Sequence, residues 1–161
     1  MSTVAEHVDV QAPIETVFDC WSCFEVFPTF LAGVDAVERI DPGRTRWVVS
    51  IGGVRRAFDA ALVGWIPNEY LEWETTEGAV SHQGTVRFER LAADATRVVV
   101  RLEWEPFGVL EHACHSLGLD RRQVRADLHR FKELVEAEPL RAEAIREYAR
   151  RHAAGYAVQQ R

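Results

Sequence analysis

The sequence predicts an α+β fold in which a long C-terminal helix covers one face of a curved antiparallel sheet of seven strands. Apolar and polar residues alternate in six runs between residues 34 and 106, and a further alternating run opens the chain. An apolar stripe with helical spacing follows the last of these runs. Because one helix covers only one face of a sheet, these patterns favour two packed layers.

The first 33 residues are expected to form one strand and two short helices between the first and second strands. Alternation over residues 3–11 predicts a strand, and its polar members suit a sheet edge. Pro13 suits the first turn of a helix, where an N–H has no helical partner to lose. Apolar residues then recur at helical spacing: Val17, Phe18, Trp21 and Phe24.

Six further strands are expected before residue 106. Short segments rich in Gly, Pro, Asn and Asp separate them, as in hairpin turns. Strands joined by such short turns pair antiparallel, so the sheet is expected to be a meander. The predicted strands are 34–40, 44–51, 54–65, 70–76, 79–91 and 96–105.

Two hairpins are short enough to predict a register. In both, large apolar residues share an inner face, and in the first hairpin Arg46, Arg55 and Asp59 share the outer face. A two-residue turn at Gly52-Gly53 pairs Ile51 with Val54, Val49 with Arg56, Trp47 with Phe58, and Arg46 with Asp59. The same turn at Glu77-Gly78 pairs Thr75 with Val80, Trp73 with His82, and Leu71 with Gly84.

One tryptophan does not follow the inner-face pattern. If the strand alternated regularly, Trp65 would lie on the outer face of the sheet. It is therefore expected either to cover one end of the sheet or to mark a bulge. The inner face that remains is rich in aromatic rings. Because one helical stripe cannot fill a strongly curved sheet, a cavity is expected between the sheet and the C-terminal helix.

The C-terminal part is expected to be helical. A short helix over about 109–117 precedes a long one that opens near Asp120. Its polar face includes Asp127, and Pro139 ends or kinks it. Residues 138–161 then form an extension, either one more surface helix or a frayed segment, after a single domain over residues 1–137. The apolar stripe of the long helix contains Val124, Leu128, Phe131, Leu134 and Val135.

Composition excludes several classes of function. The chain has 161 residues, 47% hydrophobic, with 19 Lys and Arg against 25 Asp and Glu. The net charge of −6 gives no general attraction to phosphate backbones, so nucleic acid is not expected as a partner. No apolar run approaches the roughly 18 residues of a spanning helix, and the start lacks the pattern of a signal peptide. A cytoplasmic location is therefore expected.

The cysteines and histidines give weak signals for redox or metal chemistry. Cys20 and Cys23 form a C-x-x-C motif, but it lies near a helix end, whereas reactive pairs use a helix N-terminus. Structural thiols are the favoured interpretation over redox or metal binding. The group His112, Cys114 and His115 lacks a complete set of ligands, so no metal and no cofactor are expected.

Several stretches of the chain resemble a known family. They include Gly84-Thr85-Val86-Arg87-Phe88-Glu89 and Asp127-Leu128-His129-Arg130-Phe131-Lys132, with residues 17–31, 53–60, 96–98 and 105–106. These stretches resemble the bacterial polyketide cyclase/dehydrase-like proteins of the START-like, helix-grip superfamily, which also includes coenzyme-Q-binding proteins. The resemblance covers about residues 4–137 and implies a seven-stranded sheet that grips the C-terminal helix around an apolar ligand cavity.

The sequence departs from that family's pattern at three positions. Cys20 and Cys23 stand where polar residues without a thiol are usual. His82 stands where a small polar residue such as Asn is common. His82 is therefore either a polar contact in the cavity or a core histidine. Arg56 is either a guanidinium at the cavity mouth or an arginine that reaches solvent.

Three functions are weighed on this basis. The first is non-covalent binding of a hydrophobic polyketide, isoprenoid quinone or lipid. The second is a polyketide aromatase/cyclase in which His82 moves a proton and Arg56 stabilises an enolate oxygen. The third is a protein-interaction module, like the ribosome-associated toxins of that superfamily, which the acidic charge disfavours. Expected ligand-binding residues are Trp47, Val49, Arg56, Phe58, Leu71, Trp73, His82, Phe88, Leu102, Trp104, Val124, Leu128 and Phe131.

Overall fold

The computed structural model describes residues 2–51, 53–78, 80–105 and 121–159, and it confirms the predicted α+β architecture. The predicted helix over 109–117 and the group His112, Cys114 and His115 lie outside the described residues. The elements are β1 (Ser2–Val10), α1 (Ile14–Trp21), the 3-10 helix η1 (Phe24–Thr29), β2 (Val34–Asp41), β3 (Arg44–Ile51), β4 (Val54–Ile66), β5 (Tyr70–Gly78), β6 (Ser81–Ala92), β7 (Ala95–Glu105), α3 (Arg121–Ala137) and α4 (Pro139–Gln159).

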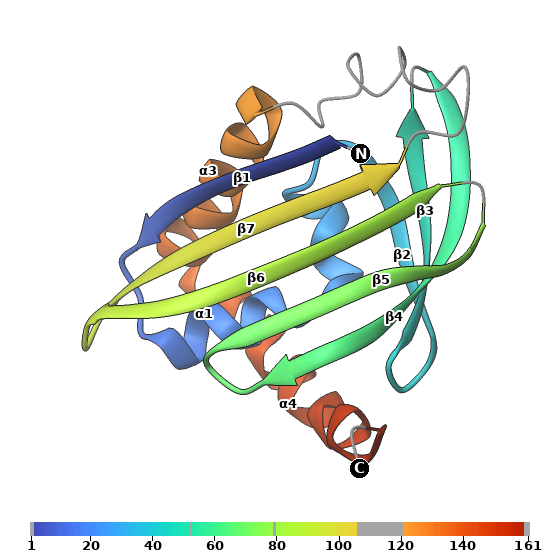
Figure 1. Ribbon diagram of the computed structural model, residues 1–161. Coiled ribbons are helices and arrows are strands. Elements are labelled where there is room, and N and C mark those ends of the chain that lie inside the picture. The colour runs from blue at the N-terminus through green and yellow to red at the C-terminus, as the bar shows by residue number, and fades with distance from the viewer. Residues whose placement is uncertain (1, 52, 79, 106–120, 160–161) are drawn as a thin grey trace.

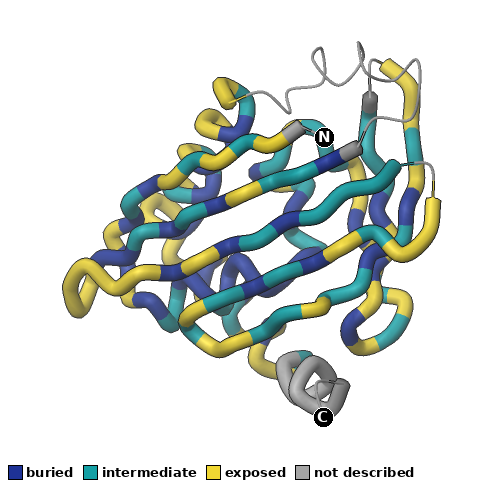
Figure 2. Tube along the Cα trace, viewed as in Figure 1, coloured by how far each residue is buried: buried dark blue, intermediate teal, exposed yellow. Residues whose placement is uncertain are grey.

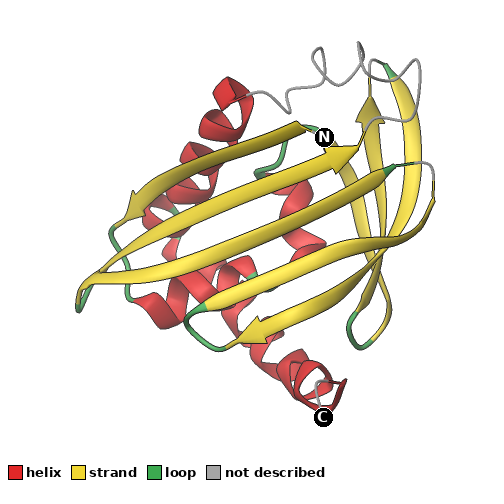
Figure 3. Cartoon of the chain, in the orientation of Figure 1, coloured by secondary structure: helices red, strands yellow, loops and turns green. Residues whose placement is uncertain are grey.

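The seven strands form one antiparallel sheet in the order β1-β7-β6-β5-β4-β3-β2. The described helices all lie on one side of this sheet, and β3 and β2 curl around at one end of it (Figures 1 and 3). Buried and more exposed positions alternate along the strands, as Figure 2 shows, so one sheet face forms the core. The predicted apolar stripe of α3 is confirmed, because Val124, Leu128, Phe131, Leu134 and Val135 are all buried.

The β3–β4 hairpin has the predicted register. Trp47 pairs with Phe58 on the inner face, and Arg46 pairs with Asp59 on the outer face. The Arg46 guanidinium donates two hydrogen bonds to the Asp59 carboxylate, at 2.9 and 3.2 Å. Gly53 has a φ of +79°, which L residues with side chains rarely adopt. The two-residue turn in the sequence was therefore sufficient to predict which residues of β3 and β4 pair.

The predicted register of β5 with β6 is wrong by two residues. Trp73 pairs with Gly84 instead of His82, and Leu71 pairs with Val86 instead of Gly84. Glu77 and Gly78 do not form the turn, because both continue β5 and pair with β4. A shift of two residues keeps every side chain on its predicted face.

The predicted pairing of Thr75 with Val80 is also wrong, because Thr75 faces His82. The Thr75 hydroxyl accepts a hydrogen bond from the His82 N–H at 2.9 Å and donates one to the His82 carbonyl at 3.0 Å. The Thr75 side chain thus makes the two hydrogen bonds that the backbone of a cross-strand partner would ordinarily make with His82.

Trp65 lies beyond a bulge, which was one of its two predicted explanations. The register of β4 with β5 shifts between Leu62 and Gly64. The extra residue moves Trp65 to a position opposite Leu71, where its ring lies 6.4 Å from that of Phe18. The irregular strand therefore turns this indole toward the helices.

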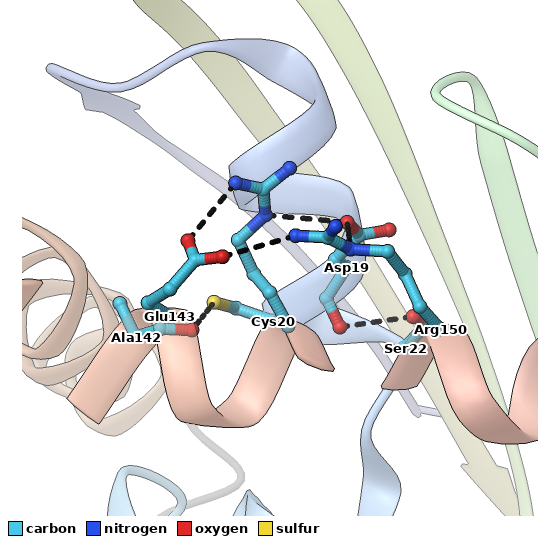
Figure 4. A network of polar contacts seen from close by, with 7 residues as sticks. Asp19, Cys20, Ser22, Ala142, Glu143 and Arg150 are labelled. Atoms are coloured by element: carbon cyan, nitrogen blue, oxygen red, sulfur yellow. Dashed lines mark hydrogen bonds and ion pairs between the residues drawn. The ribbon is translucent and has the colours of Figure 1, made fainter. Parts of the chain in front are cut away.

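The C-terminal extension forms a helix, α4, which packs against α1 and α3. Over residues 139–152, where burial is described, the buried residues are Ala142, Ile145 and Ala149. Arg146 donates a hydrogen bond to Asp19 of α1 at 3.2 Å, and Arg150 lies 3.6 Å from the same carboxylate. Figure 4 shows Asp19 of α1 close to Arg150 of α4 where the two helices meet.

None of the described helices combines the length and the apolar character that crossing a membrane requires.

Candidate functional site

An apolar cavity of about 90 Å³ lies on the inner face of the sheet, between the ends of β3 to β7 and the first turns of α3. Pockets for drug-sized ligands measure roughly 300 to 1,000 Å³, so such a ligand would have to displace wall side chains. The cavity is lined by Leu31, Gly33, Val34, Trp47, Val49, Ser50, Phe58, Trp73, Val80, His82, Leu102, Trp104, Val124 and Asp127.

Stacked aromatic rings form one wall of the cavity. Trp47 lies between Phe58 and Trp73, with ring centroids 5.5 and 6.1 Å away and interplanar angles of 19° and 20°. These three residues come from inner-face positions of β3, β4 and β5; Trp47 and Phe58 are direct cross-strand partners, whereas Trp73 pairs with Leu62, further along β4. Flat surfaces of this kind are suited to planar ligands.

The structure places eight of the thirteen expected residues at the cavity. Four others lie in the solid core, where aromatic rings of α1 cover at least two of them. Phe88 contacts Phe18 at 5.2 Å, and Phe131 contacts Trp21 at 4.7 Å between ring centroids. The eight are Trp47, Val49, Phe58, Trp73, His82, Leu102, Trp104 and Val124, and the four are Leu71, Phe88, Leu128 and Phe131.

Arg56, the remaining expected residue, does not line the cavity. It pairs with Val49, which does, so its backbone lies beside the wall. Its side chain is half-buried, and its Nε has no hydrogen-bond partner among the described residues.

His82 lies among the three stacked rings. Its ring centroid is 6.3 Å from Trp47, 6.0 Å from Phe58 and 6.2 Å from Trp73. Desolvation in these surroundings lowers the pKa of His82 to about 4, although the Glu103 backbone acts in the opposite direction. The imidazole is therefore neutral at pH 7 and is a weak base.

Two buried donors on the cavity wall lack partners. The indole N–H groups of Trp73 and Trp104 have no hydrogen-bond acceptor among the described residues, although these side chains are only 2% and 5% exposed. Trp47 differs, because its N–H donates to the Thr45 hydroxyl at 2.8 Å. A buried donor without an acceptor costs about 1–3 kcal/mol. A ligand with suitably placed oxygen atoms would remove that cost.

Asp127 is a cavity residue that the sequence prediction placed wrongly on the exposed face of α3. It is buried, and burial raises the pKa of its carboxyl despite several hydrogen bonds. Its Oδ1 accepts hydrogen bonds from the Ala32 N–H at 3.3 Å, from Gln123 at 2.9 Å and from Arg130. Asp127 follows Val124 by three positions, so strict helical spacing places it on the edge of the apolar stripe.

The sequence prediction also missed five other lining residues. Val80 was predicted on the inner face with His82 but was not among the expected ligand-binding residues. The others come from the segment after η1 and from strand ends, where periodicity is a poor guide to which side chains line a cavity. These residues are Leu31, Gly33, Val34, Ser50 and Val80.

The C-x-x-C thiols lie in the core, away from the cavity. Burial raises the pKa of Cys20 and of Cys23 to about 12, so neither is a thiolate at neutral pH. The Cys20 thiol lies 3.6 Å from the Ala142 carbonyl of α4. Within the described ranges, no group of three or more His, Cys, Asp or Glu residues is arranged to hold a metal ion.

A family model described as polyketide cyclase/dehydrase and lipid transport matches residues 10–132. The chain belongs to this family. An uncharacterized 17.2 kDa protein from the melC2-rnhH intergenic region of Streptomyces lincolnensis is 38% identical over 136 residues, which cover 84% of this chain and 91% of the relative. The helix α4 lies beyond the residues that the family model matches.

Solved structures show the START-like, helix-grip fold of this family. A START superfamily protein from Mycobacterium smegmatis is 21% identical with a TM-score of 0.65, over 82% of this chain and 98% of that one. The Zhui aromatase/cyclase from Streptomyces sp. R1128 is 17% identical with a TM-score of 0.67, over 84% of this chain and 96% of that one.

Proposed function

We propose that this protein binds an apolar, ring-containing small molecule with hydrogen-bond-accepting oxygen atoms, of the polyketide or isoprenoid-quinone type. The observation that carries this proposal is the pair of buried, unpartnered indole N–H groups, Trp73 and Trp104, on the wall of an apolar cavity. A carbonyl oxygen placed against either group would complete a hydrogen bond that the described residues leave unmade.

The aromatic wall supports a planar ligand over a simple acyl chain. The rings of Trp47, Phe58 and Trp73 can make ring-to-ring contacts with a planar ligand, which the methylene groups of an acyl chain cannot make. The family description names both polyketide and lipid ligands, and the geometry favours the first class.

Binding is favoured over the alternative, a cyclase that uses His82 and Arg56. A general base works best with a pKa near the operating pH, and the pKa of His82 is lowered to about 4. Arg56 does not line the cavity. A cyclase reaction is tested by comparing the products formed from a poly-β-keto substrate by the wild type and by His82→Ala, which should be the same under the binding proposal.

Native mass spectrometry of the purified protein tests whether it carries a ligand. We expect a bound small molecule, or uptake of an added quinone. A protein that is always empty and takes up neither quinones nor aromatic ketones contradicts the proposal.

A matched pair of probes tests the role of the indole donors. 2-Acetylnaphthalene and 2-ethylnaphthalene have nearly the same shape, but only the first has a carbonyl oxygen. We expect tighter binding of the ketone, by about fivefold for one net hydrogen bond. Trp73→Phe and Trp104→Phe keep a ring but remove one N–H each, and at least one of them should abolish the difference. Equal affinity of the wild type for both probes contradicts the role of the donors.

A further inference from the structure

We infer that Gly84 determines the size of ligand that the cavity accepts, because it lets the Trp73 indole lie directly against β6. The inference rests on the proposed binding function, which it extends to selection by size. It assigns a specificity role to a residue that is not itself among the cavity-lining residues.

The contact between Gly84 and Trp73 leaves no room for a side chain. A Cβ atom added to Gly84 would lie 2.2 Å from Cζ2, 2.4 Å from Cε2 and 2.7 Å from Cη2 of Trp73. Ordinary van der Waals contact begins at 3.4 Å, so the ring would have to move by about 1.2 Å. The atoms concerned belong to a rigid, buried ring, which cannot swing into solvent.

The register of β5 with β6 fixes this contact. Trp73 and Gly84 are direct cross-strand partners, and the pairing of Glu74 with Gln83 holds them in place. At the next residue pair along the two strands, the hydrogen bonds between the Thr75 hydroxyl and the His82 backbone hold β5 and β6 in the same register. A glycine inside a strand weakens that strand and often marks a close approach of another group. At Gly84 the approaching group is the indole.

A displaced indole would move toward the inside of the molecule, because β6 blocks the opposite direction. Phe24 and Phe27 lie 5.7 and 6.1 Å from Trp73 between ring centroids, so the core side is already filled. Trp47 stacks against the same ring at 6.1 Å. The free space next to Trp73 is the cavity of about 90 Å³. A ring pushed off β6 therefore reduces the space for a ligand.

A ligand series with one carbonyl and an increasing number of rings tests this inference: acetophenone, 2-acetylnaphthalene and 2-acetylanthracene. The readout is the affinity for each larger ketone divided by the affinity for acetophenone, measured by isothermal titration calorimetry. Gly84→Ala should lower this ratio about tenfold or more, the scale on which small changes of pocket size act. The double variant Gly84→Ala/Trp73→Phe should recover the ratio of Trp73→Phe alone.

Gly64→Ala is the matched control. Gly64 is also inside a strand, and a Cβ there would lie 2.8 Å from Cε1 of Tyr70 and 3.0 Å from Cβ of Glu72. Neither of these neighbours lines the cavity. The variant should keep the wild-type ratio.

If Gly84→Ala does not fold, Trp73→Leu tests the inference by enlarging the cavity instead of reducing it. It removes the indole from the wall, so it should raise the ratio for the larger ketones. An unchanged ratio in folded Gly84→Ala, or in Trp73→Leu, overturns the inference while the binding function stands. Failure of the wild type to bind any of the three ketones instead contradicts the proposed function.

Discussion

The Asp127 carboxylate of α3 accepts a hydrogen bond from the backbone N–H of Ala32, 3.3 Å away, in the segment that joins η1 to β2. Arg130, one turn further along α3, donates to the carbonyl of Phe30 at 3.1 Å. The neighbouring residues Leu31 and Gly33 line the cavity. The long helix therefore holds the cavity-lining segment through polar contacts as well as through its apolar stripe.

Removal of the Asp127 carboxylate should destabilise the fold. In Asp127→Ala the Ala32 N–H and two side-chain donors lose their acceptor, and the expected loss is about 1–3 kcal/mol in the free energy of unfolding. Urea denaturation measures this loss. Glu133→Ala, at an exposed position of the same helix, is the control. Equal stabilities of the two variants would show that the contact has no structural role.

The stability of the protein should fall as the pH decreases from about 6.5 to about 4 because of His82. The pKa of this histidine is lowered to about 4 by desolvation, against an ordinary value of 6.5. Between these values the unfolded chain binds a proton that the folded protein does not, so acid favours unfolding. The difference between the two pKa values corresponds to at most about 3 kcal/mol.

Urea denaturation at several pH values compares the wild type with His82→Gln. The substitution should remove most of the decrease in stability over this pH range. His7→Gln, at an exposed position of β1, should leave the decrease unchanged. The same pH dependence in the wild type and in His82→Gln would mean that the imidazole is not desolvated, because Asp19 and Asp127, whose pKa values are raised, contribute with the opposite sign in both proteins.

Cys20 and Cys23 should be unreactive in the folded protein. Disulfide reagents react with thiolates, and burial raises both pKa values to about 12. In the Cys114→Ser background, which leaves only these two thiols, dithiobis-nitrobenzoate at pH 8 should react only when urea is added. Complete reaction within minutes without urea is the contrary result.

The ion pair between Arg146 and Asp19 should contribute to the docking of α4. Burial raises the pKa of the Asp19 carboxyl, and Arg146 is the guanidinium that donates to it at 3.2 Å. Among the described residues, Arg146→Ala leaves Arg150 as the remaining guanidinium beside that carboxylate, so we expect a loss of about 1–3 kcal/mol in the free energy of unfolding. Arg151→Ala is the control, because Arg151 is mostly exposed and should contribute almost nothing. Equal losses would contradict a role for the pair.

The fold was predictable because its signals are local. Alternating strands, short turns and a helical stripe defined the elements, and the turn at Gly53 led directly to the pairing of Arg46 with Asp59. The register of β5 with β6 was not predictable in the same way. Glu77 and Gly78 have the residue types of a turn, but pairing with β4 keeps them in the strand, and this long-range interaction is not visible in a local pattern.

The site was predictable only in part. Alternation along the strands predicts which side chains face inward, but it does not predict which of them border a cavity. Trp73 and Phe88 share one face, yet Trp73 lines the cavity while Phe18 of α1 covers Phe88. Which part of the face the helices fill depends on tertiary packing. Asp127 was missed for a different reason, since its charge suggested the exposed side of α3 although its spacing fits the buried stripe.

The most direct test of the proposed binding cavity is the measurement of intermolecular nuclear Overhauser effects between 2-acetylnaphthalene and the methyl groups of the protein. We predict effects to Val49, Leu102 and Val124, which line the cavity on the sheet and on α3. Effects restricted to exposed methyl groups such as those of Val63 and Ile66, or no effects with saturating ligand, would contradict the proposal that this cavity holds the ligand.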